Sequence, residues 1–251
     1  MILAVDIGNT DIVIGLFKGS SLQCTFRLPT QHHSSLSRCK ADFLLLKKIF
    51  GTPTGIVITS VVPRRTKPIA KLASIQFHLK PLIVSATLPL GIKIHYRTPS
   101  KLGADRLCNA VAASELFGTP CIVVDFGTAT TFDVISKQGN FIGGIIAAGI
   151  GTSAMALRQR TSKLPLVQLR FQRSVIGKST VEGIQSGLLY GAVSELEGLI
   201  RRIKKITGPK TIVIATGGFS KMISKKTRVI DYVAPSLVLH GARIIFERYK
   251  N

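Results

Sequence analysis

Two short segments in distant parts of the chain combine an aspartate, a glycine and side chains that can bind phosphate, in the same order. The first segment is Asp6-Ile7-Gly8-Asn9-Thr10, and the second is Asp125-Phe126-Gly127-Thr128. A glycine lets the backbone approach a phosphate group closely, and backbone N–H groups and threonine hydroxyls then donate hydrogen bonds to it. Asp-x-Gly also occurs in ordinary hairpin turns, so one copy carries little weight. Two copies indicate a pair of phosphate-binding turns.

Apolar runs flank both segments and define the elements that must position them. Ile2–Val5 and Ile12–Phe17 enclose the first turn, whereas Cys121–Val124 and Phe132–Ile135 enclose the second. Apolar runs on both sides of a glycine turn predict pairs of buried strands with a carboxylate at each hinge. The repetition predicts a duplicated fold in which two phosphate loops face each other across a cleft. Two hairpins without a ligand are the alternative.

The order of the predicted elements repeats as well. In each half, three strands precede a helix, a further strand and a further helix, so we expect an α/β protein with two similar β-β-β-α-β-α domains. The helix predicted over Leu107–Phe117 ends at Gly118, and we place the domain boundary there, which gives domains 1–118 and 119–251. Two further helices are predicted for the second domain, over Val181–Ile206 and from Pro235 to about Tyr249.

The composition excludes several classes of protein. The 251 residues are 45% hydrophobic, enough for a globular core, and no apolar run approaches the ~18 residues that a membrane-spanning helix needs. The N-terminus has no basic segment ahead of its apolar residues, so no signal peptide is expected. The cysteines and histidines lack metal-ligand spacing, and reduced thiols of this kind indicate the cytoplasm: Cys24, Cys39, Cys108 and Cys121.

The charge is strongly unbalanced, with 34 lysines and arginines against 12 aspartates and glutamates and a net charge of +22. A nucleic acid or another anionic surface as partner would account for such a charge. The densest basic segments, Arg201–Lys205 and Lys221–Arg228, come without a nucleic-acid-binding motif, so a solvated basic face is favoured and nucleic acid is not an expected partner. Because carboxylates are scarce, those near glycines become the candidates for chemistry: Asp6, Asp105 and Asp125.

In their order along the chain, these motifs resemble those of the type III pantothenate kinases, a family of the actin, hexokinase and acetate kinase superfamily. The resemblance starts at the first turn and includes Gly103-Ala104-Asp105-Arg106, the second turn and a late Thr216-Gly217-Gly218. Further matching segments extend it over nearly the whole chain: Arg27–Thr30, Ser60–Pro63, Tyr96, Pro99, Gly143-Gly144, Leu164-Pro165, Gly177–Thr180 and Gly187–Gly191. The implied fold is the duplicated ribonuclease H-like, or actin-like ATPase, fold.

The resemblance implies transfer of the ATP γ-phosphoryl group to the primary hydroxyl of pantothenate, which gives 4'-phosphopantothenate in the first step of coenzyme A biosynthesis. Such a transfer depends mainly on alignment and charge neutralisation, with a modest role for a base. Asp105 is the candidate general base, because a carboxylate at a helix start can reach a substrate hydroxyl. Without the motif, the same residue would be interpreted as a carboxylate that complements the helix dipole.

The resemblance also implies substrate contacts. Arg106 would pair with the carboxylate of pantothenate, since a guanidinium binds a carboxylate bidentately. Tyr96 would pack on the substrate, and Thr180 resembles the family's substrate-contacting threonine. Taken alone, these would be a surface arginine, a core tyrosine and a helix N-cap for which Ser179 competes. The implied substrate-binding set is Tyr96, Gly103, Ala104, Asp105, Arg106 and Thr180.

ATP and two cations complete the implied site. The candidate ATP-binding residues are Asp6, Ile7, Gly8, Asn9, Thr10, Asp11, Gly127 and Thr128. Asp6 would hold Mg²⁺, which prefers carboxylates together with phosphates. Asp125 corresponds to the family's ligand for a monovalent cation, K⁺ or NH₄⁺. Gly217 and Gly218 are expected near the adenosine, although a glycine pair after a strand is often only a turn.

The family resemblance further implies a homodimer in the cytoplasm, without a membrane. The predicted helix Val181–Ile206 is a candidate interface and equally a candidate core helix. Two alternatives stay open. One is a non-catalytic regulator that keeps the nucleotide-binding fold and binds nucleic acid through its basic surface, against which the three aspartates argue. The other is a related kinase that acts on another small acid.

Overall fold

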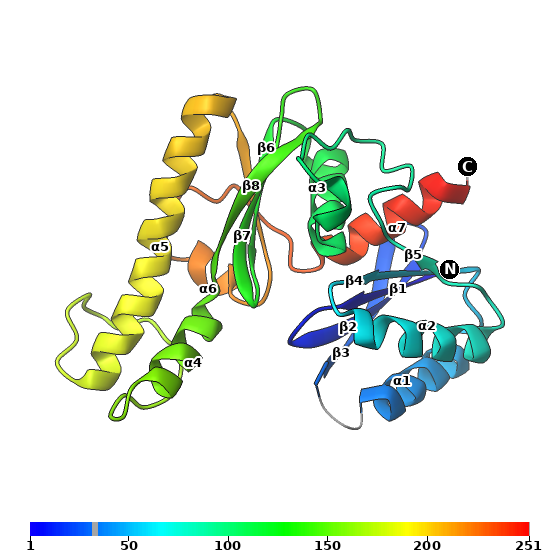
Figure 1. Ribbon diagram of the computed structural model, residues 1–251, viewed down its shortest axis with the longest axis horizontal. Coiled ribbons are helices and arrows are strands. Elements are labelled where there is room, and N and C mark those ends of the chain that lie inside the picture. The colour runs from blue at the N-terminus through cyan, green and yellow to red at the C-terminus, as the bar shows by residue number, and fades with distance from the viewer. Residues whose placement is uncertain (32–34, 251) are drawn as a thin grey trace. The chain divides into compact units, whose positions relative to one another are not determined.

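The computed structural model describes residues 1–31 and 35–250 and divides the chain into two units (Figure 1). Unit 1 comprises Met1–Leu116 together with Leu237–Asn251, and unit 2 comprises Phe117–Ser236. Each unit contains a five-stranded mixed sheet. Within the described residues, no helix combines the length and the apolar character that a membrane span requires.

Unit 1 follows the predicted order of three strands, a helix, a strand and a helix. Its elements are β1 (Ile2–Ile7), β2 (Asp11–Lys18), β3 (Ser21–Pro29), α1 (Ser35–Phe50), β4 (Gly55–Ser60), α2 (Pro63–Phe77), β5 (Leu82–Ile83), the 3₁₀ turn η1 (Pro99–Lys101), α3 (Ala104–Phe117) and α7 (Leu237–Lys250). The strands are ordered β3-β2-β1-β4-β5. Strand β2 is antiparallel to β1 and β3, whereas β4 is parallel to β1 and β5.

Alternation along β1 sends its side chains to opposite faces of the unit 1 sheet. Leu3, Val5 and Ile7 are fully buried and pack with apolar residues of β4, α1 and α2 into one core. Because neighbouring side chains in a strand point to opposite faces, Asp6 and its register partner Thr59 belong to the other face. The core therefore fixes the direction in which the first aspartate points.

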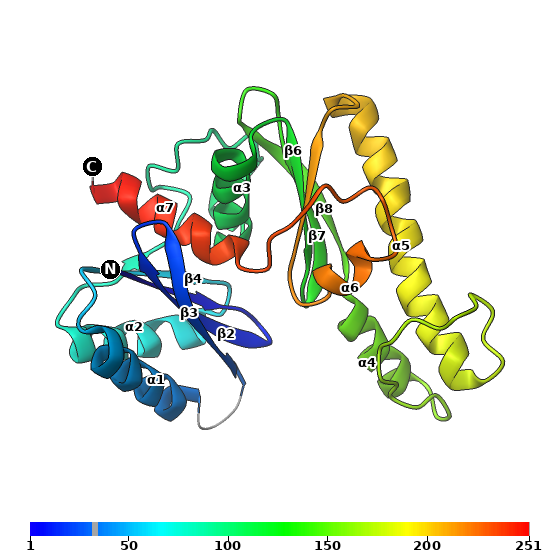
Figure 2. The ribbon, with the colours of Figure 1, turned by 180° about the vertical axis from the view of Figure 1, so that it is seen from behind.

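Helix α7 packs on that other face of the same sheet, close to β1 and β4 (Figure 2). A Cβ at Gly55 would overlap the ring of Phe246, and a Cβ at Gly241 would overlap the main chain of Cys108. Glycines thus let α7 come directly against β4 and α3. The predicted domain 119–251 therefore differs from the structure at its end, because these contacts assign the last helix to unit 1.

Unit 2 repeats the plan of unit 1, with one much longer helix, α5 (Thr180–Thr207). Its elements are β6 (Cys121–Phe126), β7 (Ala129–Ile135), β8 (Phe141–Ala148), α4 (Ile150–Arg160), α5 (Thr180–Thr207), β9 (Ile212–Thr216), α6 (Ser220–Ser224) and β10 (Tyr232–Val233). Ile122, Val124 and Phe126 of β6 pack with buried residues of α5 such as Leu189 and Leu196. The long helix lies within one residue of its prediction at each end.

The two sheets correspond strand by strand. The order β8-β7-β6-β9-β10 in unit 2 matches β3-β2-β1-β4-β5 in unit 1, with antiparallel and parallel neighbours in the same places. The predicted duplicated α/β fold is therefore confirmed. In both units, the turn after the central strand carries one of the two Asp-x-Gly segments.

Candidate functional site

The first predicted phosphate turn joins β1 to β2 and is closed by its own main chain. The Gly8 N–H donates to the Asp11 carbonyl oxygen at 2.9 Å. Thr30, which is fully buried, fixes the turn from the end of β3. Its hydroxyl donates to the Gly8 carbonyl at 2.7 Å, and its N–H donates to the Thr10 carbonyl at 2.8 Å. Asn9 and Thr10 remain exposed, so the tip of the turn can meet a ligand.

The carboxylate of Asp11, a member of the predicted ATP-binding set, has a cationic partner within the chain. The Arg27 guanidinium on the neighbouring strand β3 pairs with it at 2.7 Å, and both side chains are partly exposed. Ion pairs of this kind contribute little to stability. The structure gives Asp11 a role in joining β2 to β3 at the base of the turn.

The second predicted turn joins β6 to β7 and is packed against the start of α4. The Gly127 N–H donates to the Ala129 carbonyl at 3.1 Å. The Thr128 carbonyl accepts from the Gly149 N–H at 3.2 Å and from the Thr152 hydroxyl at 2.6 Å. A Cβ at Gly149 would overlap the Gly127 and Thr128 carbonyls, so glycine alone fits there. The N-terminal end of a helix therefore lies beside the turn, which favours a bound anion.

The two aspartates occupy equivalent positions in their sheets. Asp6 is in register with Thr59 of the parallel strand β4, and Asp125 is in register with Thr216 of the parallel strand β9. Both threonines are buried. A Cβ at Gly217 would overlap the Asp125 carboxylate, so the chain after β9 approaches this aspartate closely. Sequence reasoning gives Thr59 no role. The signal that marks it is the recurrence of an apolar strand with a threonine at or next to its C-terminal end.

Asp105 lies in the first turn of α3, which begins at Ala104 rather than at the predicted Leu107. Its Oδ1 accepts the Arg106 N–H at 2.7 Å. Gly103 makes room for this arrangement, since a Cβ there would overlap the same oxygen. Burial raises the pKa of Asp105 above 3.8, and the N–H and guanidinium of Arg106 oppose that rise without cancelling it. A carboxylate with a raised pKa accepts a proton more readily than an ordinary aspartate.

The structure brings Asp6 and Asp105 together around Cys108. This thiol is fully buried, one helical turn after Asp105 on α3. Burial raises the pKa of the Cys108 thiol, the neighbouring Thr59 hydroxyl opposes that rise, and the charges of Asp6 and Asp105 add to it. Because both carboxylates act on one thiol, the candidate base and the candidate Mg²⁺ ligand lie on the same side of the unit 1 sheet.

The remaining candidate substrate residues are divided between the units. Tyr96, which is 36% exposed, lies in the irregular segment between β5 and α3, and Arg106 is buried at the start of α3. Thr180 is the first residue of α5 in unit 2. Ser179 caps this helix instead, since its side chain accepts the Glu182 N–H at 3.3 Å. The exposed Thr180 side chain is therefore not used for capping.

The carboxylates of the candidate site are suited to a Mg²⁺ ion that takes most of its ligands from the phosphates of ATP. Among the described residues, no three side chains of His, Cys, Asp or Glu gather into a metal-binding cluster. Mg²⁺ is commonly bound by one or two carboxylates together with phosphates. Asp6 suits this donor set, because it is the penultimate residue of β1, just before a phosphate-type turn. Asp125 offers the equivalent oxygen donors at the second turn.

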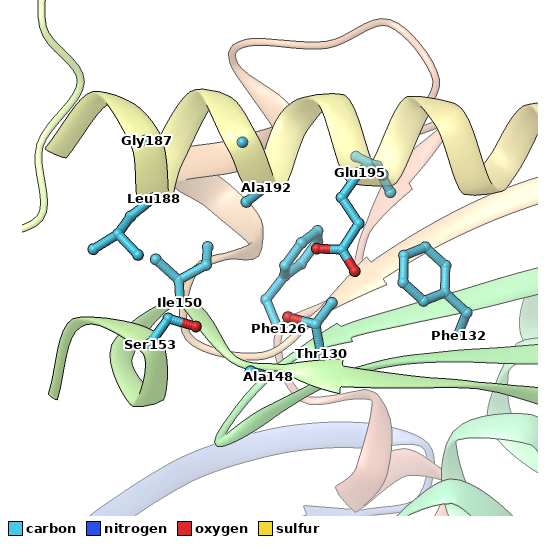
Figure 3. Close-up of a pocket in the computed structure, with 12 residues that line it drawn as sticks. Phe126, Thr130, Phe132, Ala148, Ile150, Ser153, Gly187, Leu188, Ala192 and Glu195 are labelled. Atoms are coloured by element: carbon cyan, nitrogen blue, oxygen red, sulfur yellow. The ribbon is translucent and has the colours of Figure 1, made fainter. Parts of the chain in front are cut away.

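A cavity of about 300 Å³ opens in unit 2 between the sheet and helices α4 and α5 (Figure 3). Phe126, Thr130 and Phe132 line it on the sheet side, and Glu195 of α5 is the one charged residue among those that line it. None of the predicted site residues lines this cavity. A carboxylate repels phosphate, so the cavity does not suit the phosphates of ATP.

The two densest basic segments of the sequence meet in unit 2. Arg201, Lys204, Lys205 and Arg228 line one groove near the C-terminal end of α5. Lysines in the last turn of a helix complement the negative end of its dipole. Their position agrees with the solvated basic face that the sequence favours.

Comparison with known proteins finds relatives along the whole chain. A family model described as type III pantothenate kinase matches residues 2–202. The type III pantothenate kinase of Moorella thermoacetica is 42% identical over 256 residues, which cover 99% of each chain.

Solved structures with the same architecture extend to more distant proteins. A conserved Campylobacter jejuni protein described as a Baf family transcriptional activator has a TM-score of 0.61 at 19% identity, covering 98% of this chain and 97% of its own. The (R)-2-hydroxyglutaryl-CoA dehydratase component A of Acidaminococcus fermentans has a TM-score of 0.59 at 15% identity, covering 99% and 97%. MreB 5 of Spiroplasma citri, bound to AMPPNP, has a TM-score of 0.51 at 12% identity, covering 99% and 96%. At these identities, the similarity shows the actin-like fold alone.

Proposed function

The chain belongs to the type III pantothenate kinase family, and from this premise we propose that Asp105 and the two Asp-x-Gly turns carry its reaction. The protein phosphorylates pantothenate with ATP, in the first step of coenzyme A biosynthesis. The observation that supports this site most strongly concerns the Asp105 carboxylate. Burial raises its pKa, and it lies near Cys108, as the Asp6 carboxylate does. A base and a metal-binding carboxylate on one side of a sheet suit phosphoryl transfer to a hydroxyl.

Asp105 acts as the general base in this proposal. Its carboxylate takes the proton of the pantothenate hydroxyl while that oxygen bonds to the γ-phosphorus. The bond from phosphorus to the bridging oxygen breaks, and ADP leaves. Burial supports this role because it raises the pKa of Asp105, and the bond from the Arg106 N–H at 2.7 Å holds the carboxylate in one orientation. The helix-dipole alternative does not account for the burial, since complementing a dipole needs no desolvation.

The two turns bind the phosphates of ATP. The backbone and exposed side chains of Gly8, Asn9 and Thr10 serve the first turn, and those of Gly127 and Thr128 serve the second. Thr30 and Gly149 hold these turns in shape. Asp6 holds Mg²⁺ and Asp125 holds K⁺ or NH₄⁺. When bound, these cations supply the positive charge that offsets the charge on the transferring phosphoryl group.

Arg106 recognises the carboxylate of pantothenate. Its buried guanidinium supports this role, because a buried arginine fork is pre-organised for bidentate binding. Tyr96 packs on the substrate from the irregular segment between β5 and α3. Thr180 is a further substrate contact, consistent with a hydroxyl that is exposed and not used for capping.

The active form is a cytoplasmic homodimer in this proposal. Helix α5 supports a dimer interface, because Gly183, Gly187 and Gly191 recur at every fourth position and a Cβ at each would meet nothing within 4 Å beyond its chain neighbours and the adjacent backbone of its own helix. Such a stripe lets another helix approach closely. The free thiols of all four cysteines agree with a reducing compartment. Light scattering on the purified protein measures the mass that tests the dimer.

The test follows ADP release from purified protein with ATP, Mg²⁺ and pantothenate, first in K⁺ and then in Na⁺ buffer. We expect pantothenate-dependent turnover in K⁺, a marked fall in Na⁺ and almost complete loss in Asp105→Asn. Asp42→Asn is the matched control, because Asp42 on α1 also has a pKa raised by burial but takes no part in the proposed site. No turnover in K⁺ or NH₄⁺ from folded protein would overturn the proposal.

The same assay separates the alternatives. Turnover with another small hydroxy acid but not with pantothenate identifies a related kinase. A regulator that binds nucleic acid would give no turnover, and its binding to duplex DNA would weaken steeply with salt because phosphate contacts release counterions.

A further inference from the structure

The hydroxyl of Thr59 is a buried polar group that lacks a strong hydrogen-bonding partner among the described residues and has the weakly bonding Cys108 thiol beside it. Thr59 is fully buried near the end of β4, and its Oγ1 finds no partner at hydrogen-bonding geometry among the described residues. Buried hydroxyls in folded proteins are nearly always satisfied, since an unpaired one destabilises the fold. A buried threonine hydroxyl at such a position points to a nearby acceptor that it can engage when the site is loaded.

The surroundings of Thr59 indicate which partner that is. In the parallel register of β1 and β4, Thr59 lies directly beside Asp6 and on the same face of the sheet. From α3, Cys108 lies against it, with Asp105 one turn earlier on the same helix. The thiol is a weak hydrogen-bonding group and satisfies a hydroxyl poorly. The strong acceptor in register with Thr59 is the carboxylate proposed to bind Mg²⁺.

We propose that Thr59 is a positioning residue for Asp6, an inference that rests on the proposed Mg²⁺ role of this aspartate. Its hydroxyl donates to the Asp6 carboxylate in the Mg²⁺- and ATP-loaded enzyme and fixes the orientation in which the carboxylate meets the metal. Hydrogen bonds to a ligating carboxylate commonly matter for metal affinity nearly as much as the ligand itself. In the ligand-free protein the hydroxyl has only the weakly bonding Cys108 thiol beside it among the described residues, so the fold gives up stability at this position to keep the site ready.

The proposal predicts opposite effects on stability and on metal use. Thr59→Val keeps the shape of the side chain and removes the hydroxyl. We expect the melting temperature of the ligand-free protein to rise by about 2 °C or more, because an unsatisfied buried group is lost. The Mg²⁺ concentration for half-maximal rate should rise by about tenfold, with the KM for pantothenate within about twofold of wild type. Thr59→Ser restores the hydroxyl and should bring the Mg²⁺ dependence back to within about threefold of wild type.

Thr211→Val is the matched control. Thr211, just before β9 begins, is also buried, but its hydroxyl has partners within hydrogen-bonding distance: Thr207 Oγ1 at 2.8 Å and the Gly208 carbonyl oxygen at 2.7 Å. This control should lower the melting temperature by about 2–4 °C and leave the Mg²⁺ dependence unchanged. The same change in chemistry thus has opposite expected signs at the two positions.

The outcomes separate the inference from the function on which it rests. A stabilised Thr59→Val protein with weakened Mg²⁺ use, corrected by serine, supports the positioning role. If wild type is active and Thr59→Val needs no more Mg²⁺ than wild type, the positioning role is wrong although the kinase function stands. If Thr59→Val melts lower and serine does not restore Mg²⁺ use, Thr59 is a packing residue only. Lack of activity in wild type refutes the proposed function itself and the inference with it.

Discussion

Adding one methyl group at Gly103 should displace the proposed base without altering its chemistry. A Cβ at this position would lie closer than 3.0 Å to Oδ1 of Asp105, a separation that real Cβ atoms do not show. The Val61 side chain lies 3.4 Å away on another side, so the methyl group cannot simply shift toward it. The carboxylate is the atom group that can move, and it must rotate away from its bond to the Arg106 N–H.

The size of this displacement sets the expected effect. The carboxylate oxygen must retreat by about 1 Å before it reaches the range beyond 3.4 Å where ordinary contact begins. Misplacing a catalytic group by about 1 Å can lower a rate by about 100-fold, which corresponds to about 2.7 kcal/mol of transition-state stabilisation. We therefore expect the kcat of Gly103→Ala to fall by about 100-fold, while the KM for ATP stays within about twofold because the phosphate turns are untouched.

Steady-state ADP release with varied pantothenate and varied ATP measures both quantities. Gly198→Ala in α5 is the control, because its Cβ meets nothing closer than the flexible end of Arg202 at 3.4 Å. That control should keep full activity. If Gly103→Ala turns over within threefold of wild type, the orientation of the Asp105 carboxylate is not decisive, and its role as base loses its main structural support.

Three further predictions follow from the same contacts. Burial raises the pKa of Asp105, so ionisation of this carboxyl favours the unfolded state. The destabilisation is absent below pH 3.8 and grows as the pH rises from there through the pKa of Asp105 in the folded protein. Asp105→Asn should therefore unfold at higher urea concentration than wild type at pH 7, with a gap that closes toward pH 4. A less stable mutant at pH 7 would contradict this. Gly149→Ala forces a Cβ into the carbonyl of Thr128 and so displaces the second turn. The KM for ATP should therefore rise about tenfold or more in initial-rate measurements. An unchanged KM would show that the second turn is not part of the ATP site. Gly241→Ala drives a Cβ into the main chain of Cys108 and should lower the free energy of unfolding by about 3 kcal/mol in urea titrations; a loss below 1 kcal/mol would show that α7 can shift on α3.

The duplicated fold could be predicted because its signal is local. Each half repeats apolar runs around an aspartate and a glycine, and the period of those runs specifies strands wherever one face is buried. The end of the chain was not predictable in this way. The apolar pattern of α7 indicates a helix with a buried side but not the sheet that buries it. That choice depends on Gly55 and Gly241, which leave room for Phe246 and for the α3 main chain.

In the candidate site, too, the features with a local sequence signal could be predicted, whereas those that depend on tertiary contacts could not. The two turns and Asp105 could be selected as candidates from residue types and spacing, since a glycine near a carboxylate is visible in the sequence, whereas the role of Asp105 as base was implied only by the family resemblance. The contribution of Thr59 was not visible, because it depends on the register between β1 and β4, which are separated by β2, β3 and α1. The cap of α5 could not be decided either. Ser179 and Thr180 are both good N-cap residues, and the geometry of the first turn selects the serine.

In the proposed site one motif serves two different cations, and the surroundings of the duplicated turns supply a physical reason for that difference. Asp6 and Asp125 are equivalent in register, and each has a buried threonine beside it. Their further neighbours differ. Beside Asp6, α3 adds the Asp105 carboxylate, and two nearby carboxylates favour a small divalent ion. Beside Asp125, Gly217 brings main chain close to the single carboxylate, and this weaker charge suits a monovalent ion better. In this proposal, α3, which places Asp105 beside the first turn, decides that proton transfer takes place in unit 1. The turn itself does not decide it, because both units have one.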